Sequence, residues 1–419
     1  MFHWRQTVGD NQCLASNVSM IRKKFLKNSG ATIRLAITET RSLAHCIEIF
    51  IVRSGIRRLG VLLALIFFLL PVAAFAADKS LANREQLLWF PALATPQQEG
   101  WNVSISGLIT EDEKHPAISW LARRLLGFSH EELGPLERAI FSARTQRFLA
   151  DDERGKRIEV EFLGKRHKLG RTGRNGNFSG KIVLPQNALR LGAQPFPALV
   201  LVNKRVISNE VQICAVPREG ISVVSDIDDT IKISDVRNRD ELMRNTFLRP
   251  FRGVDGMAEL YQGWSTHSAA QFHYVSGSPW QLFPALNEFI ITNKFPAGSW
   301  HLRSVRLLDT SVAELLRTPD AHKRAVIEEL FTRLPERKFV LVGDSGERDP
   351  EIYGDLARRH PKSVSQIFIR NVTDEVLTNL RMVTAFQGLT EQGCVLFKTA
   401  EELPRGLSVK KNQERPGKK

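Results

Sequence analysis

The chain has 419 residues, enough for two or three domains, and its 59 Lys and Arg against 45 Asp and Glu give a formal net charge of +14. A basic excess suits anionic membranes or phosphorylated substrates. No DNA- or RNA-binding motif is visible, however, and the aromatic residues do not alternate with a basic run, so we expect no nucleic-acid partner. Of the four cysteines, Cys13 and Cys46 lie before residue 77, in a predicted leader, and the remaining Cys214 and Cys394 are too few for a disulfide framework. No Cys/His cluster has zinc spacing.

A secretory signal is predicted in the first part of the chain. Arg57 and Arg58 give a basic start, the apolar run Leu59–Ala77 follows, and Ala74-Phe75-Ala76 has the small-x-small pattern of a cleavage site. About 50 residues precede it, which leaves two interpretations: a misassigned start, or a cytoplasmic arm before a single N-terminal membrane anchor. The apolar run is marginal for an anchor, which needs ~20 residues, so we favour the misassigned start. Both interpretations predict an exported protein of the periplasm or cell envelope.

A β-rich domain is predicted after the signal. Residues 98–116 and 146–215 alternate apolar and polar positions, as in Ile158–Phe162, and turns rich in Gly and Asn separate these runs. The pattern is typical of short antiparallel strands in a sandwich. Two helical stretches, Ile118–Phe128 and Leu133–Arg147, interrupt it. A β-sandwich is as often a passive packing unit as a binding module, so the role of this domain stays open.

The stretch Asp226-Ile227-Asp228-Asp229-Thr230 is the most informative part of the sequence. It follows the apolar run Ile221–Ser225, which is typical of a buried strand. Side chains two apart in an extended segment point the same way, so the Asp226 and Asp228 carboxylates share one side of the chain. One carboxylate can attack phosphorus, the other can move protons, and a hard cation such as Mg²⁺ would relieve their repulsion.

Three further polar groups follow at the ends of predicted elements. Ser276 comes after a strand over 272–275, and a glycine-flanked acidic loop containing Asp344 comes after a strand over 338–342. Lys323 lies in the first turn of a helix predicted over 321–331. In parallel α/β sheets ligands bind beyond the carboxyl ends of the strands, so these groups are expected to meet in one site.

The order of these motifs resembles the haloacid dehalogenase superfamily of phosphotransferases. It is most similar to the phosphatidate phosphatase catalytic domains of the fungal actin-patch protein and its bacterial relatives, over roughly residues 219–400. The phrases that carry this resemblance are SDIDDTIK (225–232), YVSGSPWQLFPAL (274–286) and FVLVGDSGERDPEIY (339–353). The resemblance implies a Rossmann-like parallel sheet with helices on both faces. It also implies the domain boundaries 1–76 for the leader and signal, 77–218 for the β-rich domain, 219–404 for the catalytic domain and 405–419 for a basic tail.

The resemblance also implies roles for individual residues. Asp226 would be the nucleophile, forming an aspartyl-phosphate, and Asp228 the acid/base. Thr230, Ser276 and Lys323 would bind the phosphoryl group. Mg²⁺ would be held by Asp226, by the backbone carbonyl of Asp228, and by Asp344 and Asp349.

Some of these residues have plainer interpretations from the sequence alone. Ser276 fits an ordinary turn, and Lys323 fits a solvated helix face. Asp349 precedes Pro350 and fits a helix cap as well as a metal ligand. Asp229 is either a supporting partner of the site or a turn acid, and it receives no role.

Two segments bear on the substrate. Residues 231–253 lie where the superfamily has a flap over its site, and they leave no room for a large cap domain between Asp228 and Ser276. An open site is compatible with a bulky or membrane-embedded substrate. Five arginines in this insert could meet a phosphate or a headgroup: Arg237, Arg239, Arg244, Arg249 and Arg252. The tail, residues 405–419, could touch anionic lipid, although a solvated tail is favoured.

These observations predict an exported, Mg²⁺-dependent phosphatidate phosphatase with a phospholipid substrate and peripheral membrane contact. The alternatives are a phosphatase of soluble or protein-bound phosphomonoesters, and a non-catalytic envelope binding protein with a vestigial phosphatase fold. The intact motifs argue against the last alternative. Cys214 and Cys394 each lie in an apolar run, and burial as free thiols is favoured over pairing.

Overall fold

The structure is a computed structural model that describes residues 85–111, 133–149, 151–152, 154–173, 176–303, 320–389 and 393–408. The predicted signal, the helix predicted over 118–128 and most of the tail lie outside these ranges. All the described residues belong to one compact unit, 82–419. None of the helices in the described ranges is long and apolar enough to cross a membrane.

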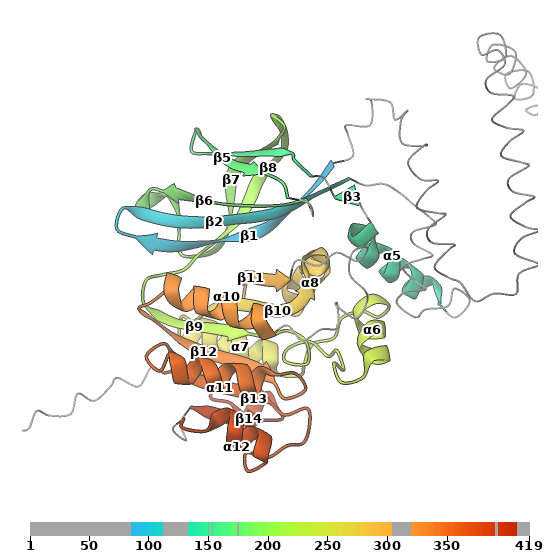
Figure 1. Cartoon of the computed structure of the whole chain (residues 1–419), viewed down its shortest axis with the longest axis vertical. Coiled ribbons are helices and arrows are strands. Elements are labelled where there is room, and N and C mark those ends of the chain that lie inside the picture. The colour runs from blue at the N-terminus through green and yellow to red at the C-terminus, as the bar shows by residue number, and fades with distance from the viewer. Residues whose placement is uncertain are drawn as a thin grey trace, which may run out of the picture. The chain divides into compact units, whose positions relative to one another are not determined.

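The chain is an α/β protein with two separate sheets (Figure 1). The strands of the first sheet are β1 (Glu85–Gln97), β2 (Gly100–Glu111), β3 (Asp151–Asp152), β4 (Arg157–Phe162), β5 (Lys165–Arg171), β6 (Asn177–Leu184), β7 (Gly192–Val202) and β8 (Arg205–Ala215). Those of the second sheet are β9 (Gly220–Ser225), β10 (Gln271–Pro279), β11 (Gly298–Arg303), β12 (Arg337–Asp344), β13 (Val364–Arg370) and β14 (Cys394–Phe397). The helices that matter below are α5 (Pro135–Leu149), α6 (Arg239–Phe247), α7 (Met257–His267), α8 (Phe283–Thr292), α10 (Asp320–Arg333), α11 (Asp349–Arg359) and α12 (Leu380–Phe386).

The first sheet is mixed and nearly closed, so the predicted antiparallel sandwich is wrong. Its eight strands run in the order β3-β2-β1-β8-β7-β4-β5, and β6 also pairs with β2. β1 and β8 pair in parallel, which joins the two halves into one sheet instead of two packed layers. Leu169 of β5 packs against Gly180 of β6, where an added Cβ would lie 2.6 Å from the leucine side chain. The predicted helix over 133–147 is confirmed as α5.

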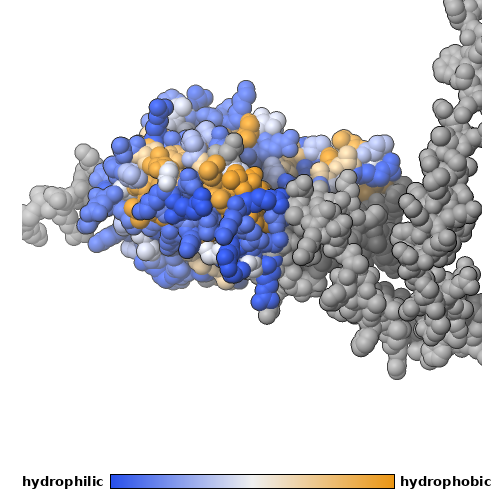
Figure 2. Space-filling view, turned by 90° about the horizontal axis from the view of Figure 1, so that it is seen from above, coloured by the Kyte–Doolittle hydropathy of each residue, from blue (hydrophilic) through white to orange (hydrophobic). Residues whose placement is uncertain are grey.

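The surface of the β-rich part carries scattered apolar side chains. Figure 2 shows a largely hydrophilic face with hydrophobic groups among the hydrophilic ones. The exposed large hydrophobic residues of this part include Leu163, Val183, Leu191, Leu199 and Val206. Exposed hydrophobics scattered in this way are normal on soluble domains.

The second sheet is parallel throughout and positions the candidate site. Its strand order is β11-β10-β9-β12-β13-β14. Alternate residues of its strands face opposite cores: Val223 packs in one core with α7 and α8, and Val224 packs in another with α10 and α11. The chain therefore has helices on both faces of this sheet (Figure 1). The strands predicted over 221–225, 272–275 and 338–342 are confirmed as β9, β10 and β12, and the helix predicted over 321–331 is confirmed as α10.

The order of the strands creates a switch point between β9 and β12. From β9 the chain moves outward through β10 to β11, and from β12 it moves the other way through β13 to β14. In sheets of this kind, a crevice opens at the carboxyl ends of the two strands where the direction reverses. Asp226 directly follows β9, and Asp344 is the last residue of β12.

The two cysteines do not pair. Cys214 is a buried free thiol on β8, and Cys394 is a partly buried free thiol at the start of β14. Burial raises the pKa of each thiol to about 12. Both are core residues, as favoured from the sequence.

Candidate active site

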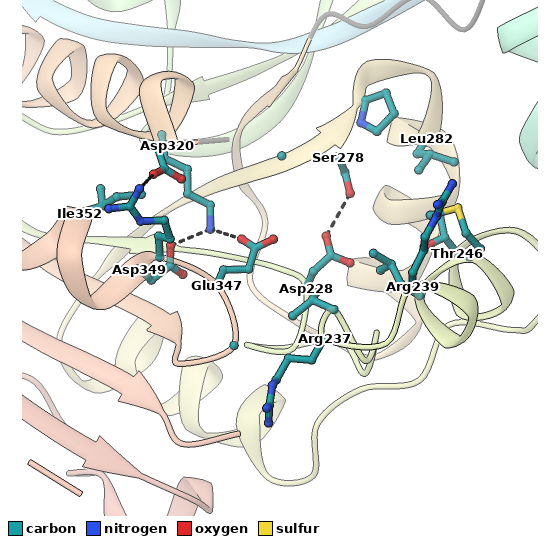
Figure 3. Close-up of a pocket in the computed structure, with 18 of the residues that line it drawn as sticks. Asp228, Arg237, Arg239, Thr246, Ser278, Leu282, Asp320, Glu347, Asp349 and Ile352 are labelled. Atoms are coloured by element: carbon teal, nitrogen blue, oxygen red, sulfur yellow. Dashed lines mark hydrogen bonds and ion pairs between the residues drawn. The ribbon is translucent and has the colours of Figure 1, made fainter. Parts of the chain in front are cut away.

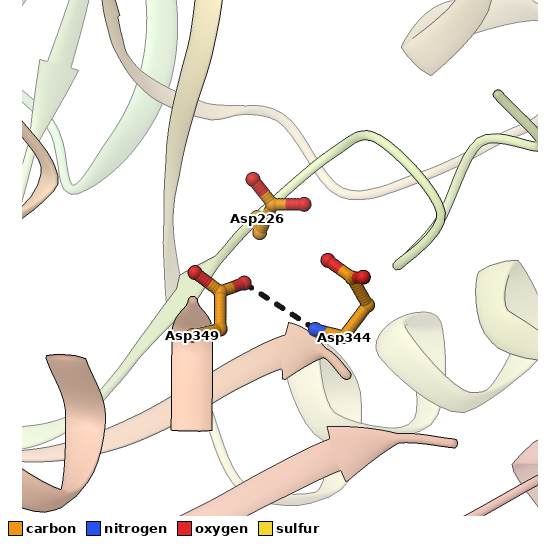
Figure 4. Close-up of side chains that lie close together, drawn as sticks. All are labelled: Asp226, Asp344 and Asp349. Atoms are coloured by element: carbon orange, nitrogen blue, oxygen red, sulfur yellow. Dashed lines mark hydrogen bonds between the residues drawn. The ribbon is translucent and has the colours of Figure 1, made fainter. Parts of the chain in front are cut away.

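Three aspartates converge at the switch point. One carboxylate oxygen from each of Asp226, Asp344 and Asp349 lies within 4.8 Å of the others (Figure 4). We call these three residues the acidic triad. They come from the ends of β9 and β12 and the start of α11, and all are buried. The sheet topology therefore assembles carboxylates that are over 100 residues apart in the chain.

Burial gives the acidic triad unusual electrostatics. Burial raises the pKa of Asp226 well above its usual value, against the opposing effect of Lys323, and Asp349 raises it further. Burial also raises the pKa of Asp344, and Asp349 and Asp226 add to this effect. Such crowding of buried acids is costly unless a cation compensates the charge.

Local backbone features make room for the carboxylates of the triad. A Cβ added at Gly343 would lie 2.2 Å from Asp349 Oδ2, and one added at Gly346 would lie 2.9 Å from Asp344 Oδ1. The amides of Gly346 and Glu347 donate to Asp344 Oδ1 at 2.6 and 3.1 Å. The glycine-flanked loop that stands out in the sequence therefore has a packing reason.

The acidic triad fits a divalent cation. Asp344 Oδ2 is buried and has no hydrogen-bond partner among the described residues, so a lone pair is left for another ligand. All donors of the triad are oxygens, which Mg²⁺ prefers, whereas Zn²⁺ favours nitrogen and sulfur. A divalent cation is thus compatible with the site, and the side chains that would hold it are Asp226, Asp344 and Asp349.

Lys323 is buried among the acids and does not lie on a solvated helix face. Its Nζ lies 2.9 Å from Asp226 Oδ1, 2.8 Å from Glu347 Oε2 and 2.7 Å from Asp349 Oδ1. Burial alone lowers the pKa of Lys323, but Asp226 and Asp349 outweigh it and raise the pKa well above its usual value. The lysine is therefore a fixed positive charge beside the expected position of a phosphoryl group.

Asp228 lies in a different environment from the triad. Ser276 and Ser278 donate to its Oδ2 at 3.2 and 3.0 Å, and Ser234 donates to its Oδ1 at 2.7 Å. The buried ammonium of Lys232 lies 2.7 Å from Oδ1. Burial alone would raise the pKa of Asp228, but the charge of Lys232 and these hydrogen bonds bring it to about 2.

Thr230 and Asp229 support the loop that carries the two aspartates. Thr230 donates to Asp226 Oδ2 at 3.1 Å and is fully buried. Asp229 has a positive φ of 53° and accepts from the amides of residues 234, 235 and 236 at 2.7 to 2.9 Å. Asp229 thus ties the start of the 231–253 insert to the strand end, which is a supporting role for a residue given none from sequence.

The capping interpretation of Asp349 is wrong. Helix α11 begins at Asp349 itself, its cap position is Arg348, and no side chain caps it. The Asp349 carboxylate instead contacts Lys323 through Oδ1 and accepts from the Asp344 amide through Oδ2, at 3.3 Å. Its side chain is part of the acidic triad.

The sequence did not single out Lys232, Ser278 or Glu347. Lys232 lies four residues after Asp228, and Ser278 lies two residues after Ser276, so both were within motifs already in view. Glu347 lies between Asp344 and Asp349, and its Oε2 contacts Lys323. Spacing alone did not separate these contacts from ordinary loop residues.

A pocket of about 590 Å³ opens beside Asp228, Lys323, Glu347 and Asp349. Figure 3 shows Glu347 and Asp349 on one side, Asp228 and Ser278 in the middle, and Arg239, Thr246 and Leu282 on the other side. The lining includes four apolar side chains from α6 and the 3₁₀ helix Trp280–Leu282, which we call the apolar wall: Leu242, Met243, Phe247 and Leu282. Arg237, Arg239, Arg348 and Arg381 also line the pocket. Of the five arginines in the insert, Arg237 and Arg239 lie among the lining residues.

A parallel α/β domain that gathers two aspartates, a lysine and two further acids at a switch point has the arrangement of a phosphatase catalytic domain. Residues 221–371 match the family model described as the catalytic domain of phosphatidate phosphatase APP1. This segment is therefore a phosphatidate phosphatase-like catalytic domain, and the resemblance to phosphatidate phosphatase catalytic domains is confirmed.

Two curated proteins are similar to part of the chain. Phosphatidate phosphatase APP1 of Saccharomyces cerevisiae is 35% identical over 155 residues, which is 36% of this chain and 26% of that protein. An uncharacterized protein of Schizosaccharomyces pombe is 33% identical over 171 residues, which is 40% of this chain and 28% of that protein. The similarity thus spans about a quarter of the length of these relatives.

Proposed function

We propose that the chain is a Mg²⁺-dependent phosphatase of the haloacid dehalogenase type that hydrolyses a lipid phosphomonoester, phosphatidate to diacylglycerol. The observation that carries the proposal is the convergence of Asp226, Asp228 and Lys323 with Asp344 and Asp349 at one switch point. The similarity to a phosphatidate phosphatase supports the substrate class.

In the proposed reaction the Asp226 carboxylate attacks phosphorus and the bond from phosphorus to the alcohol oxygen breaks. Asp228 gives a proton to the leaving oxygen, so the products are the alcohol and an aspartyl-phosphate at Asp226. Water then attacks that phosphoryl group, Asp228 takes a proton from the water, and the Asp226 carboxylate is regenerated. Lys323 and the hydroxyls of Thr230 and Ser276 hold the phosphoryl oxygens.

The bound cation would neutralise charge on the phosphoryl oxygens and on the acidic triad. Asp228 is held as a carboxylate in the free protein, because its pKa is about 2. That state suits its second role, the activation of water. For its first role, Asp228 first takes a proton from the solvent, and an arriving phosphate dianion favours this uptake because a like charge raises the pKa of Asp228.

The composition of the pocket supports an amphiphilic substrate over a small soluble phosphomonoester. Lys323, Glu347 and Asp349 line the phosphoryl end, and Leu282 of the apolar wall lies across the pocket from Glu347 and Asp349. Burial of hydrocarbon against this wall would stabilise the bound substrate by ~25 cal/mol for each Å² of apolar surface removed from water. The second candidate substrate is a soluble or protein-bound phosphomonoester. The four arginines that line the pocket favour this candidate.

The test is phosphate release by the purified chain from a panel of lipid and soluble phosphomonoesters. We expect release from phosphatidate with Mg²⁺, none with excess chelator, and recovery when Mg²⁺ is restored. Hydrolysis of soluble phosphomonoesters alone would favour the second candidate. Absence of release from the whole panel, by a chain that binds Mg²⁺, would favour the vestigial alternative.

We also propose that the chain is exported, with peripheral contact to a membrane that supplies the lipid. The support is the basic, apolar and small-x-small pattern of residues 57–76. N-terminal sequencing of the protein from fractionated cells should give Ala77 as the first residue, in the envelope or periplasmic fraction. Full-length protein recovered from the cytosol would refute export.

A further inference from the structure

Helix α5 lies outside the matched catalytic segment, yet it supports one side of the pocket. It contacts both α6 and the short 3₁₀ helix η4 (Trp280–Leu282), which carry the apolar wall. Phe141 and Phe148 of α5 are buried in the same core as Phe247 and Leu282. The Phe148 and Phe247 rings meet edge to face, with centroids 6.1 Å apart.

Arg144 makes a polar link between α5 and the insert. Its Nη1 donates to the carbonyls of Asn245 at 3.4 Å, Thr246 at 2.7 Å and Arg249 at 2.8 Å. Its guanidinium carbon lies 3.6 Å from the centroid of the Phe251 ring. One side chain thus binds the last turn of α6 and the segment that follows it.

The planar guanidinium of Arg144 is well suited to this contact. The last carbonyls of a helix lack partners inside the helix, and a cation there also meets the negative end of the helix dipole. A planar guanidinium can donate to carbonyls while it stacks on an aromatic ring, which an ammonium does less well. Burial lowers the pKa of Arg144 to about 10, against the opposing effect of Glu288, so the side chain stays charged at neutral pH.

The insert also supplies polar contacts to α6, and Phe247 of α6 packs on Phe148 of α5. Asn238 caps its start, and Asn245 donates to the Ser234 carbonyl at 3.2 Å and to Asp235 at 3.1 Å. These polar contacts lie within residues 234–245, so they do not tie the end of α6 to the rest of the protein. The Arg144 link spans about 100 residues of sequence and supplies a polar tie of that kind.

We propose that Arg144 is a positioning residue that holds α6 in place and thereby sets the affinity of the pocket for the hydrocarbon part of the substrate. The proposal rests on the proposed function for its substrate, although the link itself does not. Arg144 touches no group assigned to phosphoryl transfer. Its loss should therefore change KM for substrates that reach the apolar wall, and change kcat little.

The test compares Arg144→Met, Arg144→Lys and a matched control, Arg138→Met. Methionine keeps the apolar stem and removes the guanidinium. Arg138 lies on the same helix and donates to the Leu133 carbonyl at 2.8 Å, away from α6. KM and kcat are measured with dioctanoyl and dibutanoyl phosphatidate, and hydrogen exchange is measured on the α6 amides.

We expect Arg144→Met to raise KM for dioctanoyl phosphatidate about tenfold, the effect of losing hydrogen bonds to a charged group. We expect a smaller change for the dibutanoyl substrate, an intermediate effect for Arg144→Lys and no change for Arg138→Met. Exchange of the α6 amides should quicken in Arg144→Met alone. If Arg144 acts through the wall, its effect on KM and that of Met243→Ala should be non-additive in the double variant.

Two outcomes would overturn the proposal. One is an unchanged rate of hydrogen exchange at the α6 amides in Arg144→Met, which would show that Arg144 does not hold α6. The other is a fall in kcat and Tm with KM unchanged for both chain lengths, which is the result of a merely structural role. If the wild type hydrolyses neither substrate, the proposed function fails, and the exchange measurement still decides whether Arg144 holds α6.

Discussion

In the half of the site that holds the acidic triad, burial and mutual repulsion raise the pKa of Asp226 and Asp344, whereas in the half that holds Asp228 a lysine and hydroxyl groups lower the pKa of that carboxyl to about 2. The two neighbouring aspartates of one motif are only two residues apart, so the difference comes from tertiary contacts. The crowded half is suited to a cation and to the phosphoryl group, and the Asp228 half is suited to proton transfer. Groups whose environments push their pKa values apart are typical of paired catalytic roles.

The largest expected effect comes from removing the two motif carboxylates. Asp226→Asn should lower turnover by at least about 10⁴-fold, because an amide cannot form the acyl-phosphate. Asp228→Asn should lower it by ~10²–10⁴-fold through the loss of proton transfer. Rates of phosphate release measure both, and Asp374→Asn, an exposed carboxylate paired with Lys398, is the control that should keep full activity. Wild-type turnover in Asp226→Asn would contradict the division of roles.

Removing Lys323 should show how strongly the crowded buried acids destabilise the folded protein. Lys323→Met leaves buried acids without their cation, so the free energy of unfolding in the presence of chelator should fall by ~3–5 kcal/mol. Urea denaturation measures this, and Lys398→Met, at an exposed ion pair, is the control that should leave stability nearly unchanged. An equal and small effect of the two changes would mean that the acids are not charged in the folded protein.

Within the triad, Asp344 and Asp349 should differ. Both Asp349 oxygens are engaged by Lys323 or the Asp344 amide, whereas Asp344 Oδ2 has no partner among the described residues. Asp344→Asn should therefore raise the Mg²⁺ concentration needed for half the thermal stabilisation at least about tenfold, and more than Asp349→Asn does. Thermal unfolding at graded Mg²⁺ concentrations measures this without any substrate. A larger effect of Asp349→Asn would reverse the assignment.

The last effect, which disappears at low pH, concerns Lys232. Asp228 has a folded pKa of about 2, below its unfolded value of 3.8, so its stabilisation is present above about pH 4 and is lost as pH falls toward 2. The shift corresponds to about 2 kcal/mol. Lys232→Met should lower the free energy of unfolding by about this amount at pH 6, and the difference from wild type should shrink between pH 4 and 2. A difference that stays constant with pH would rule out Asp228 as the partner that matters.

The catalytic part of the fold could be predicted from the sequence because its signals are local. The apolar runs before Asp226, Ser276 and Asp344 mark strands, and parallel strands bring their carboxyl ends to one edge. The β-rich part shows the limit. Alternation marks its strands, but it does not say that β1 pairs with β8 in parallel across about 120 residues, and that pairing turns the expected sandwich into a nearly closed sheet.

The parts of the site that the sequence did not reveal depend on tertiary contacts. Lys232 and Ser278 lie next to predicted residues, but only folding shows that they bind the Asp228 carboxylate. Arg144 lies in a helix that was predicted, yet nothing in its spacing indicates contact with α6. The motifs therefore predict the reacting residues more reliably than they predict the residues that position them.

The central claim is that Asp226 is phosphorylated during turnover, and acid quenching followed by peptide mass spectrometry tests it most directly. The wild-type chain mixed with phosphatidate and Mg²⁺, and stopped within milliseconds, should carry a phosphoryl group on Asp226 that hydroxylamine removes. Asp228→Asn should hold this species longer, and Asp226→Asn should lack it. Turnover with no phosphoryl group on Asp226 at any time, or with the label on another residue, would contradict the account.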